Sequence, residues 1–265
     1  MNEMHLHSNF SPDSQTNPEE NIKFAIKNKI KNLYFTDHWE KFCQSPPHDS
    51  FFSTQKYFHT IIKLKEKYKE KINIYSGVEL GLNLKNSKEC KSFLESYDFD
   101  FSIGSIHAVD FVDVWQNRFN IGKNPKKYYL EYYSYMLSCV KEIDNFNVLG
   151  HIDYIDRYLT DKNLIPDFSF YEHLINDILK ELIKTNRGIE YNTAGLRNNL
   201  SYANPKDEIL KRYLDLGGKI ITVGSDSHTP ETIGYKFDYA YNHLKNLGFD
   251  KICIFKEKKP IFIDF

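Results

Sequence analysis

Histidine and acidic side chains recur along the chain at places where they could bind a metal ion. His5 and His7 are two residues apart, so an extended backbone would turn both imidazoles to the same face. His151, and later Asp226 and His228, follow short apolar runs and come after glycine-containing turns. Neutral imidazole and carboxylate groups are ligands of zinc, iron and manganese. These motifs therefore indicate a site for divalent cations.

Each motif taken alone has an ordinary structural explanation. A His-x-His pair occurs by chance in many proteins, and Asp37 has the residue type of a helix cap. Glu79 is more informative, because it lies in an apolar segment, where a carboxylate is costly unless it is paired or binds a metal. Together the candidates exceed what one tetrahedral ion needs, which favours several metals and hydrolysis of a phosphate ester. They are His5, His7, Asp13, Asp37, His38, Glu79, His107, His151 and Asp226.

Short apolar runs alternate along the chain with longer stretches of helical spacing. This alternation predicts a parallel sheet wrapped by helices. The expected strands are Asn32–Thr36, Ile72–Leu80, Phe99–Ser105, Val148–Leu149, Gly188–Asn192, Lys219–Val223 and Lys251–Phe255. The expected helices are Gln55–Lys71, Pro125–Ile143, Phe170–Lys184, Pro205–Leu216 and Ile233–Leu247.

The candidate ligands share one position relative to these strands. Each lies at or just beyond the carboxyl end of a strand, which in parallel α/β barrels is the end that carries the active site. Residues far apart in the sequence are therefore expected to meet at one mouth. The residues in this position are Asp37, His38, Glu79, His107, His151, Asp226 and His228.

Composition excludes several other classes of protein. The 35 Lys and Arg residues are interleaved with 36 Asp and Glu residues, which is not the pattern of a nucleic-acid-coating protein. The four cysteines are far apart and form no C-x-x-C, as is typical of thiols in a reducing cytoplasm. No run of 18 apolar residues and no Pro/Gly/Ser-rich linker occurs. We expect a single cytoplasmic domain over residues 1–265, without a nucleic-acid or membrane partner.

The motifs, taken together and in order, resemble those of the polymerase and histidinol phosphatase (PHP) family. The resemblance covers nearly the whole chain. It implies a distorted β/α barrel of the α/β class, seven-stranded and TIM-like, with a metal site at its carboxyl-terminal mouth. The matching segments are His5-Leu6-His7-Ser8, Thr36-Asp37-His38, Gly77-Val78-Glu79, Gly104-Ser105-Ile106-His107, Gly150-His151 and Gly224-Ser225-Asp226-Ser227-His228.

The resemblance also implies two or three divalent metal ions, with zinc, iron and manganese as the expected elements. The third of these metal positions departs from the family. Many members have a histidine where this chain has Asp13, whose harder oxygen favours iron or manganese over zinc. Carried over by position, the first metal would be bound by His5, His7, Glu79 and Asp226. The second would share Glu79 as a bridging ligand and would also be bound by His107 and His151. The third would be bound by Asp13, His38 and His228.

Within the family, the chain is similar to the stand-alone phosphatases, since it is short and carries no polymerase domain. That likeness implies hydrolysis of L-histidinol phosphate to L-histidinol and inorganic phosphate, in histidine biosynthesis, by a hydroxide that bridges two metals. A metal-bound water, or the side chain of Asp226 or His228, is the expected proton donor. Arg157 or Arg197 is the expected phosphate-binding residue.

Glu190 and Asn192 belong to a Glu-x-Asn-Thr-x-Gly segment that is similar to one in the family. They are expected to orient ligands or to bind the amine end of the substrate. Three alternative functions stay open from the sequence. The first is a family phosphoesterase acting on a nucleotide, a sugar phosphate or phosphotyrosine. The second is a metal-dependent amidohydrolase, although no Lys lies at a motif strand end as the usual carboxylated Lys would. The third is a non-catalytic metal-binding module.

Overall fold

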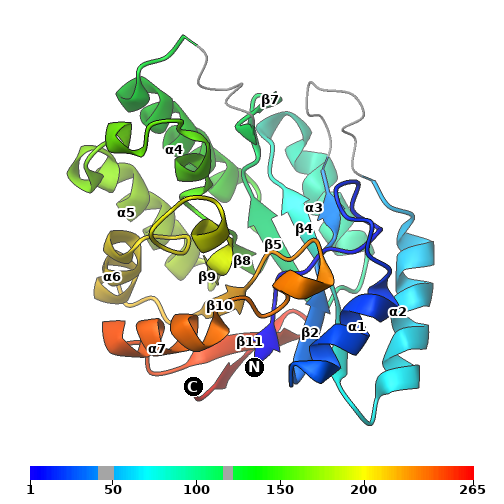
Figure 1. Ribbon diagram of the computed structural model, residues 1–265. Coiled ribbons are helices and arrows are strands. Elements are labelled where there is room, and N and C mark those ends of the chain that lie inside the picture. Colours follow the sequence, from blue (N-terminus) through cyan, green and yellow to red (C-terminus); the bar gives the residue numbers. More distant parts are fainter. Residues whose placement is uncertain (41–50, 116–121) are drawn as a thin grey trace.

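The computed structural model describes residues 1–40, 51–115 and 122–265. Within these residues, seven parallel strands form a nearly closed barrel (Figure 1). The two ends of the sheet meet where the Met4 amide donates to the Val223 carbonyl at 3.3 Å and the His7 amide to the Ser227 carbonyl at 2.8 Å. The predicted seven-stranded barrel is thereby confirmed. In spatial order its strands are β1 (Asn2–Glu3), β2 (Asn32–Phe35), β4 (Asn73–Gly81), β5 (Phe101–Ser105), β8 (Val148–Leu149), β9 (Gly188–Asn192) and β10 (Ile221–Gly224).

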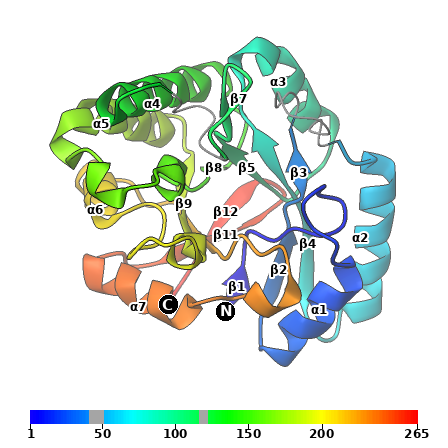
Figure 2. The ribbon, with the colours of Figure 1, turned by 45° about the horizontal axis from the view of Figure 1, so that its top comes forward.

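Helices surround the barrel as an outer layer (Figure 2). Two of them, α1 and α3, were not among the helices expected from the sequence. No described helix has both the length and the apolar character that a bilayer crossing requires. The helices are α1 (Pro18–Lys27), α2 (Thr54–Tyr68), α3 (Ser87–Ser96), α4 (Pro125–Glu142), α5 (Phe168–Lys184), α6 (Asp207–Asp215) and α7 (Phe237–Leu247).

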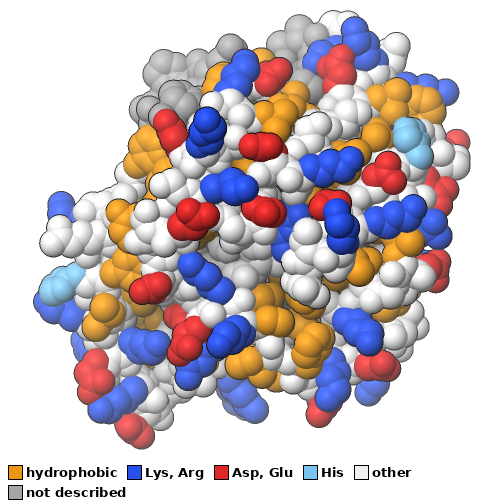
Figure 3. All heavy atoms as spheres, turned by 180° about the vertical axis from the view of Figure 1, so that it is seen from behind, with side chains coloured by type: hydrophobic (Ala, Val, Ile, Leu, Met, Phe, Trp, Pro, Cys, Tyr) orange, Lys and Arg blue, Asp and Glu red, His pale blue; other side chains and the backbone are white. Residues whose placement is uncertain are grey.

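The aromatic face of α4 packs between the barrel and α5. Tyr128, Tyr129, Tyr132 and Tyr133 follow helical spacing and are fully buried. Tyr133 stacks on Tyr171 of α5, with ring centroids 4.9 Å apart. The tyrosine-rich segment is thus a packed helix face. On the opposite side of the molecule from the view of Figure 1, acidic and basic side chains are interspersed on the surface (Figure 3).

Short strands decorate the mouth of the barrel. His38 and Trp39 form β3 (His38–Trp39), which pairs with β4 so that His38 lies beside Glu79. The hairpin of β6 (Ala108–Val109) and β7 (Val112–Asp113) follows His107 and stands at the rim. These additions bring further side chains to the carboxyl ends of the barrel strands.

A hairpin of β11 (Ile252–Lys256) and β12 (Lys259–Ile263) closes the amino-terminal end of the barrel. The expected strand 251–255 is present, but it pairs antiparallel with β12 and does not join the parallel sheet. The reason is the two-residue turn at Glu257 and Lys258, both with positive φ, which permits only a hairpin. Tyr34 donates to the Phe255 carbonyl at 2.6 Å, and Phe255 packs against Phe101 inside the barrel.

Removing a buried aromatic ring from the β11–β12 hairpin is expected to cost much more stability than removing an exposed ring from the same hairpin. Phe255→Ala should lower the free energy of unfolding by about 3–5 kcal/mol, because Phe255 is 2% exposed and a cavity would remain. Phe262→Ala, in the same hairpin but 45% exposed, should change it by about 0.5 kcal/mol or less. Urea unfolding of both variants measures the difference. Equal effects would show that the hairpin does not seal the barrel.

Candidate metal centre

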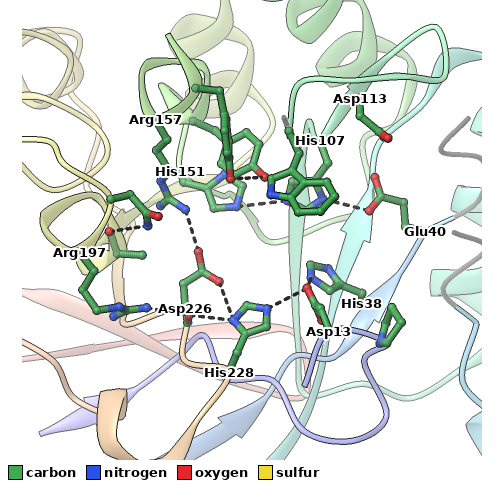
Figure 4. Close-up of a pocket in the computed structure, with 16 residues that line it drawn as sticks. Asp13, His38, Glu40, His107, Asp113, His151, Arg157, Arg197, Asp226 and His228 are labelled. Atoms are coloured by element: carbon green, nitrogen blue, oxygen red, sulfur yellow. Dashed lines mark hydrogen bonds and ion pairs between the residues drawn. The ribbon is translucent and has the colours of Figure 1, made fainter. Parts of the chain in front are cut away.

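A cavity of about 510 Å³ opens at the carboxyl ends of the barrel strands. Predicted ligands from strands far apart in the sequence converge on it (Figure 4). His5, His7 and Glu79 lie beneath its floor, in contact with lining residues such as Asp226, His38 and His151, and have no exposed surface. The side chains that line the cavity include Asp13, His38, His107, His151, Asp226 and His228. This arrangement agrees with the expectation that these residues meet at one mouth of the barrel.

The first group of donor atoms comes from the segment after β1, from β4 and from the loop after β10. The Nε2 atoms of His5 and His7 are 3.1 Å apart. Glu79 Oε2 lies 3.2 Å from His5 Nε2 and 3.4 Å from His7 Nε2. Asp226 Oδ1 lies 3.5 Å from His7 Nε2 and 3.8 Å from His5 Nε2. We call this group the first position.

The other carboxylate oxygen of Glu79 faces a second group. Glu79 Oε1 lies 3.0 Å from His151 Nε2 and 3.3 Å from His107 Nε2. The two imidazole nitrogens are 3.4 Å apart. Glu79 therefore contributes one oxygen to each group, which is the geometry of a bridging carboxylate. We call this group the second position.

A third group lies nearest to the solvent. Asp13 Oδ2 is 3.1 Å from His228 Nε2 and 3.3 Å from His38 Nε2. His7 is close enough to complete a cluster of four donors with them. Asp13 thus stands beside the two histidines with which it was expected to form the third position.

The donor set fits divalent cations. With metal–nitrogen bonds of about 2.0 Å, neighbouring ligands of a tetrahedral ion lie about 3.3 Å apart, and the distances at all three positions are close to this value. Glu79 Oε2 is buried, 3.0 Å from His38 Nδ1 and 3.2 and 3.4 Å from the Nε2 atoms of His5 and His7. Two imidazole nitrogens that face each other at 3.1 Å would repel through their lone pairs unless a proton or a cation lay between them. A cation at the first position satisfies all of these atoms together.

The electrostatics of the floor keep the acids ionised. Burial alone would raise the pKa of Glu79, but His5, His107 and His38 hold it well below its usual range. Burial and the neighbouring His228 and His38 lower the pKa of His7 to about 3. His7 is therefore a neutral imidazole at pH 7, the form that binds a metal.

Outer hydrogen bonds fix the orientation of several imidazoles. His7 Nδ1 donates to Ser11 Oγ at 3.0 Å, and Ser11 donates in turn to Asp37 at 2.8 Å. Asp37 is thus a supporting residue and not a ligand. His107 Nδ1 lies 3.1 Å from Glu40 Oε2. Such partners fix the ring and the tautomer of a metal-binding histidine.

Sequence reasoning did not single out Glu40 or Ser11. Glu40 was detectable, because it follows His38 by two residues and residues two apart in a strand share a face. Ser105 was also missed as a partner of Glu79, to which it donates a hydrogen bond of 2.7 Å.

Asp226 adopts a left-handed backbone with φ of 54°, which is uncommon for a residue other than glycine and sets the direction of its carboxylate.

Both predicted arginines line the cavity, with different partners. Arg157 donates to Asp226 Oδ2 at 3.1 Å, and also to Asn192 and Asn204. Arg197 donates to the backbone carbonyls of Ser225 and Asp226 at 2.8 and 3.0 Å. Both guanidinium groups thus lie beside the loop that carries Asp226.

Glu190 and Asn192 lie on β9, behind the ligands, and both are fully buried. Neither belongs to the wall of the cavity. Glu190 Oε1 is 2.7 Å from His5 Nδ1, and Asn192 Nδ2 donates to Glu190 Oε2 at 3.1 Å. Of the two roles expected for them, orienting a ligand fits this position better than binding the amine end of a substrate.

Comparisons with known proteins agree with this architecture. Histidinol-phosphatase of Lactococcus lactis is 31% identical over 96% of this chain and 94% of its own length. A probable histidinol-phosphatase of Clostridium acetobutylicum is also 31% identical, over 98% and 95%. The crystal structure of histidinol phosphate phosphatase from L. lactis, complexed with zinc, L-histidinol and phosphate, matches with a TM-score of 0.88 at 30% identity, covering 98% of each chain.

The family itself follows from the profile of the PHP domain, which matches residues 3–194, well over half of the chain. This segment contains the first five ligand motifs, and Asp226 and His228 follow it in the loop after β10. The barrel, the ligand clusters at its mouth and this match lead to the same assignment: the chain belongs to the PHP domain family.

Proposed function

We propose that this protein is a metal-dependent phosphomonoesterase that hydrolyses L-histidinol phosphate to L-histidinol and inorganic phosphate, a step of histidine biosynthesis. The observation that carries the proposal is the bridging position of Glu79, which contacts His107 and His151 in the wall of a cavity that two arginines also line. The related L. lactis enzyme, which binds zinc, L-histidinol and phosphate in its crystal structure, supports the choice of substrate.

Divalent ions would be held at three positions by this chain. The first would use His5, His7, Glu79 and Asp226, the second Glu79, His107 and His151, and the third Asp13, His38 and His228. When bound, such ions lower the pKa of water and neutralise charge on the phosphoryl group. The oxygen of Asp13 at the third position favours iron or manganese there.

The arginines would hold the phosphate. Arg197 reaches the cavity while its Nη1 and Nη2 atoms donate to backbone carbonyls, so its position is fixed before substrate arrives. A planar guanidinium that keeps free N–H groups can grip a phosphate oxygen and stabilise charge as the ester bond breaks. Arg157 has a second task, because it also holds the Asp226 carboxylate.

The leaving alkoxide needs a proton. Of the two side chains that could donate it, His228 is a better donor than Asp226. Burial would raise the pKa of Asp226, but His5, His7 and Arg157 hold it well below its usual range, so Asp226 carries no proton to give. Burial opposes protonation of His228, yet Asp13 and Asp226 raise its pKa. His228 Nε2 can donate a proton only while it binds no ion. His228 would therefore act as the proton donor only in enzyme molecules whose third position is empty.

We propose that residues 1–265 act as one domain, since the barrel takes strands from both ends of the chain. We also propose the cytoplasm as the compartment. Cys90, Cys139 and Cys253 are free and buried, and free thiols are the state that a reducing cytoplasm maintains.

The function is tested by steady-state hydrolysis of L-histidinol phosphate against a nucleotide, a sugar phosphate and phosphotyrosine, with metal analysis of the same sample. We expect the highest kcat/KM for L-histidinol phosphate. Activity should vanish in a verified metal-free sample and return with manganese, zinc, iron or cobalt. Preference for another ester would replace the substrate and keep the chemistry. Full activity without metal would refute the mechanism.

Glu79→Gln is expected to be the most damaging conservative change at the centre. The amide has only one oxygen to share between two positions, so metal content and turnover should fall together. Metal analysis and kinetics on one preparation measure both. Glu40→Gln is the control, because among the described residues Glu40 contacts a single ligand, His107, and its effect should be smaller. A Glu79 variant with near-normal metal content would remove this residue from the site.

The two arginines should differ in their effect on metal content. Arg197→Ala should lower kcat/KM roughly 30- to 1000-fold at unchanged metal content, because a bidentate anion contact is lost. Arg157→Ala should lower metal content as well, since Asp226 loses its partner. Arg212→Ala, outside the cavity, is the control. If both variants stay within about threefold of wild type, neither arginine grips the phosphate.

A further inference from the structure

Glu190 is a buried carboxylate that touches two ligands without lying in any of the three donor groups. We propose that Glu190 is a positioning residue that fixes the first and second metal positions relative to each other, with one oxygen on the His5 ring and the other on the His151 backbone. The inference rests on the metal centre of the proposed function, and goes beyond it by assigning an outer residue that both positions share.

The contact to His5 selects one form of its ring. Glu190 Oε1 lies 2.7 Å from His5 Nδ1, and neither atom is exposed. An ionised carboxylate only accepts hydrogen bonds, so His5 Nδ1 must carry the proton and donate it. The lone pair of His5 Nε2 then faces the first position, where His7 Nε2 and Glu79 Oε2 also point.

The second oxygen acts on the other position. Glu190 Oε2 accepts a hydrogen bond of 3.0 Å from the His151 amide. The ring of His151 has a buried Nδ1 that finds no hydrogen-bond partner among the described residues. The direction of this ring is therefore set by its backbone and by its Nε2 contacts at the second position. Glu190 is the side chain that holds this backbone amide.

A glycine of one ligand motif makes room for the carboxylate. A Cβ atom at Gly224 would lie 2.6 Å from Glu190 Oε1 and 2.4 Å from His5 Cβ, closer than real contacts allow. Gly224, two residues before Asp226, thus allows β10 to approach Glu190 closely.

The surroundings of Glu190 also call for positive charge. With cations bound, its oxygens would contact a neutral imidazole, a backbone amide and the Asn192 side chain, none of which carries a full charge. Burial of a carboxylate among neutral groups is costly. Cations bound one imidazole away would offset that cost, so Glu190 would add negative charge to the centre without binding an ion itself.

Glu190→Gln tests the role, because it keeps the shape and removes both the charge and one acceptor. If the new amide NH₂ faces His5, the ring must move its proton to Nε2, which blocks the first position. If the NH₂ faces His151, two donors oppose each other, which displaces the second. Either orientation damages one position by geometry, and loss of charge weakens both.

The experiment titrates metal-depleted protein with Zn²⁺ or Co²⁺ against a chelator of known affinity, and follows the visible absorption of bound Co²⁺. We expect Glu190→Gln to weaken the two tightest binding steps about 10- to 100-fold, the usual effect of losing an outer partner of a ligand. Glu190→Asp keeps the charge but is one methylene shorter, and should recover part of the affinity. It also serves if the Gln variant fails to fold.

Asp207→Asn is the matched control. Asp207 pairs with His243 at 2.7 Å, the same carboxylate–imidazole contact, but outside the three clusters, so metal affinity should stay at the wild-type value. Unchanged affinity in Glu190→Gln, or a lower melting temperature of the metal-free protein without weaker binding, would overturn the inference. Because binding is measured without substrate, wild-type protein that binds metal but does not hydrolyse L-histidinol phosphate would contradict the proposed function alone.

Discussion

The arrangement of the barrel mouth depends on the charge of Glu79. This carboxylate is fully buried, and its two oxygens are surrounded by imidazole nitrogens from several strands. A charge of this kind cannot stay inside a protein without compensation. Without an ion, the charge is balanced by His5, His38 and His107, whose pKa values are raised by acidic neighbours that include Glu79. A bound ion would take over this compensation, because the imidazoles that ligate it are neutral. The chemistry of the site follows from this requirement.

Groups of opposite character alternate outward from this centre. Around Glu79 lie imidazoles, and behind them lie acidic groups, with Glu190 against His5, Glu40 against His107, and Asp37 acting on His7 through a serine. Each layer holds the one inside it in place. Because Glu190 and Asp37 are held by backbone amides and hydroxyl groups, their ligands are directed before any ion binds, which reduces the entropy that binding must overcome.

The local sequence pattern was sufficient to predict the site residues whose position depends only on which end of a strand they follow. Side chains at the carboxyl ends of parallel strands must share one mouth, so the positions of Glu79, His107 and His151 followed from their strands. The partners of Arg157 did not follow, since Asn192, Asn204 and Asp226 come from three different segments and their packing decides the contact. Sequence patterning names residues that share an end of the fold, whereas specific contacts require the packed structure.

The missed elements have similar reasons. Helix α1 carried a signal, with Asn17 as its cap and Pro18 as its first residue, but it has only ten residues and a narrow apolar face. β1 has two residues and is stabilised by its neighbours in the sheet more than by its own sequence. β11 has the composition of a barrel strand. Only the tight turn after it and its pairing with β12 show that it belongs to the hairpin that closes the barrel and not to the barrel sheet.

Closure of the barrel between its first and last strands also determines when the site can exist during synthesis. The first position needs His5 and Asp226, so its ligands are separated by most of the polypeptide. A growing chain on the ribosome has made four strands of the sheet before β8 appears, yet it still lacks an acid and a wall of the cavity. Contacts this far apart in sequence form late and slowly. The nascent protein therefore has no complete first position until residue 226 has emerged, and ion capture there is one of the last events of its maturation.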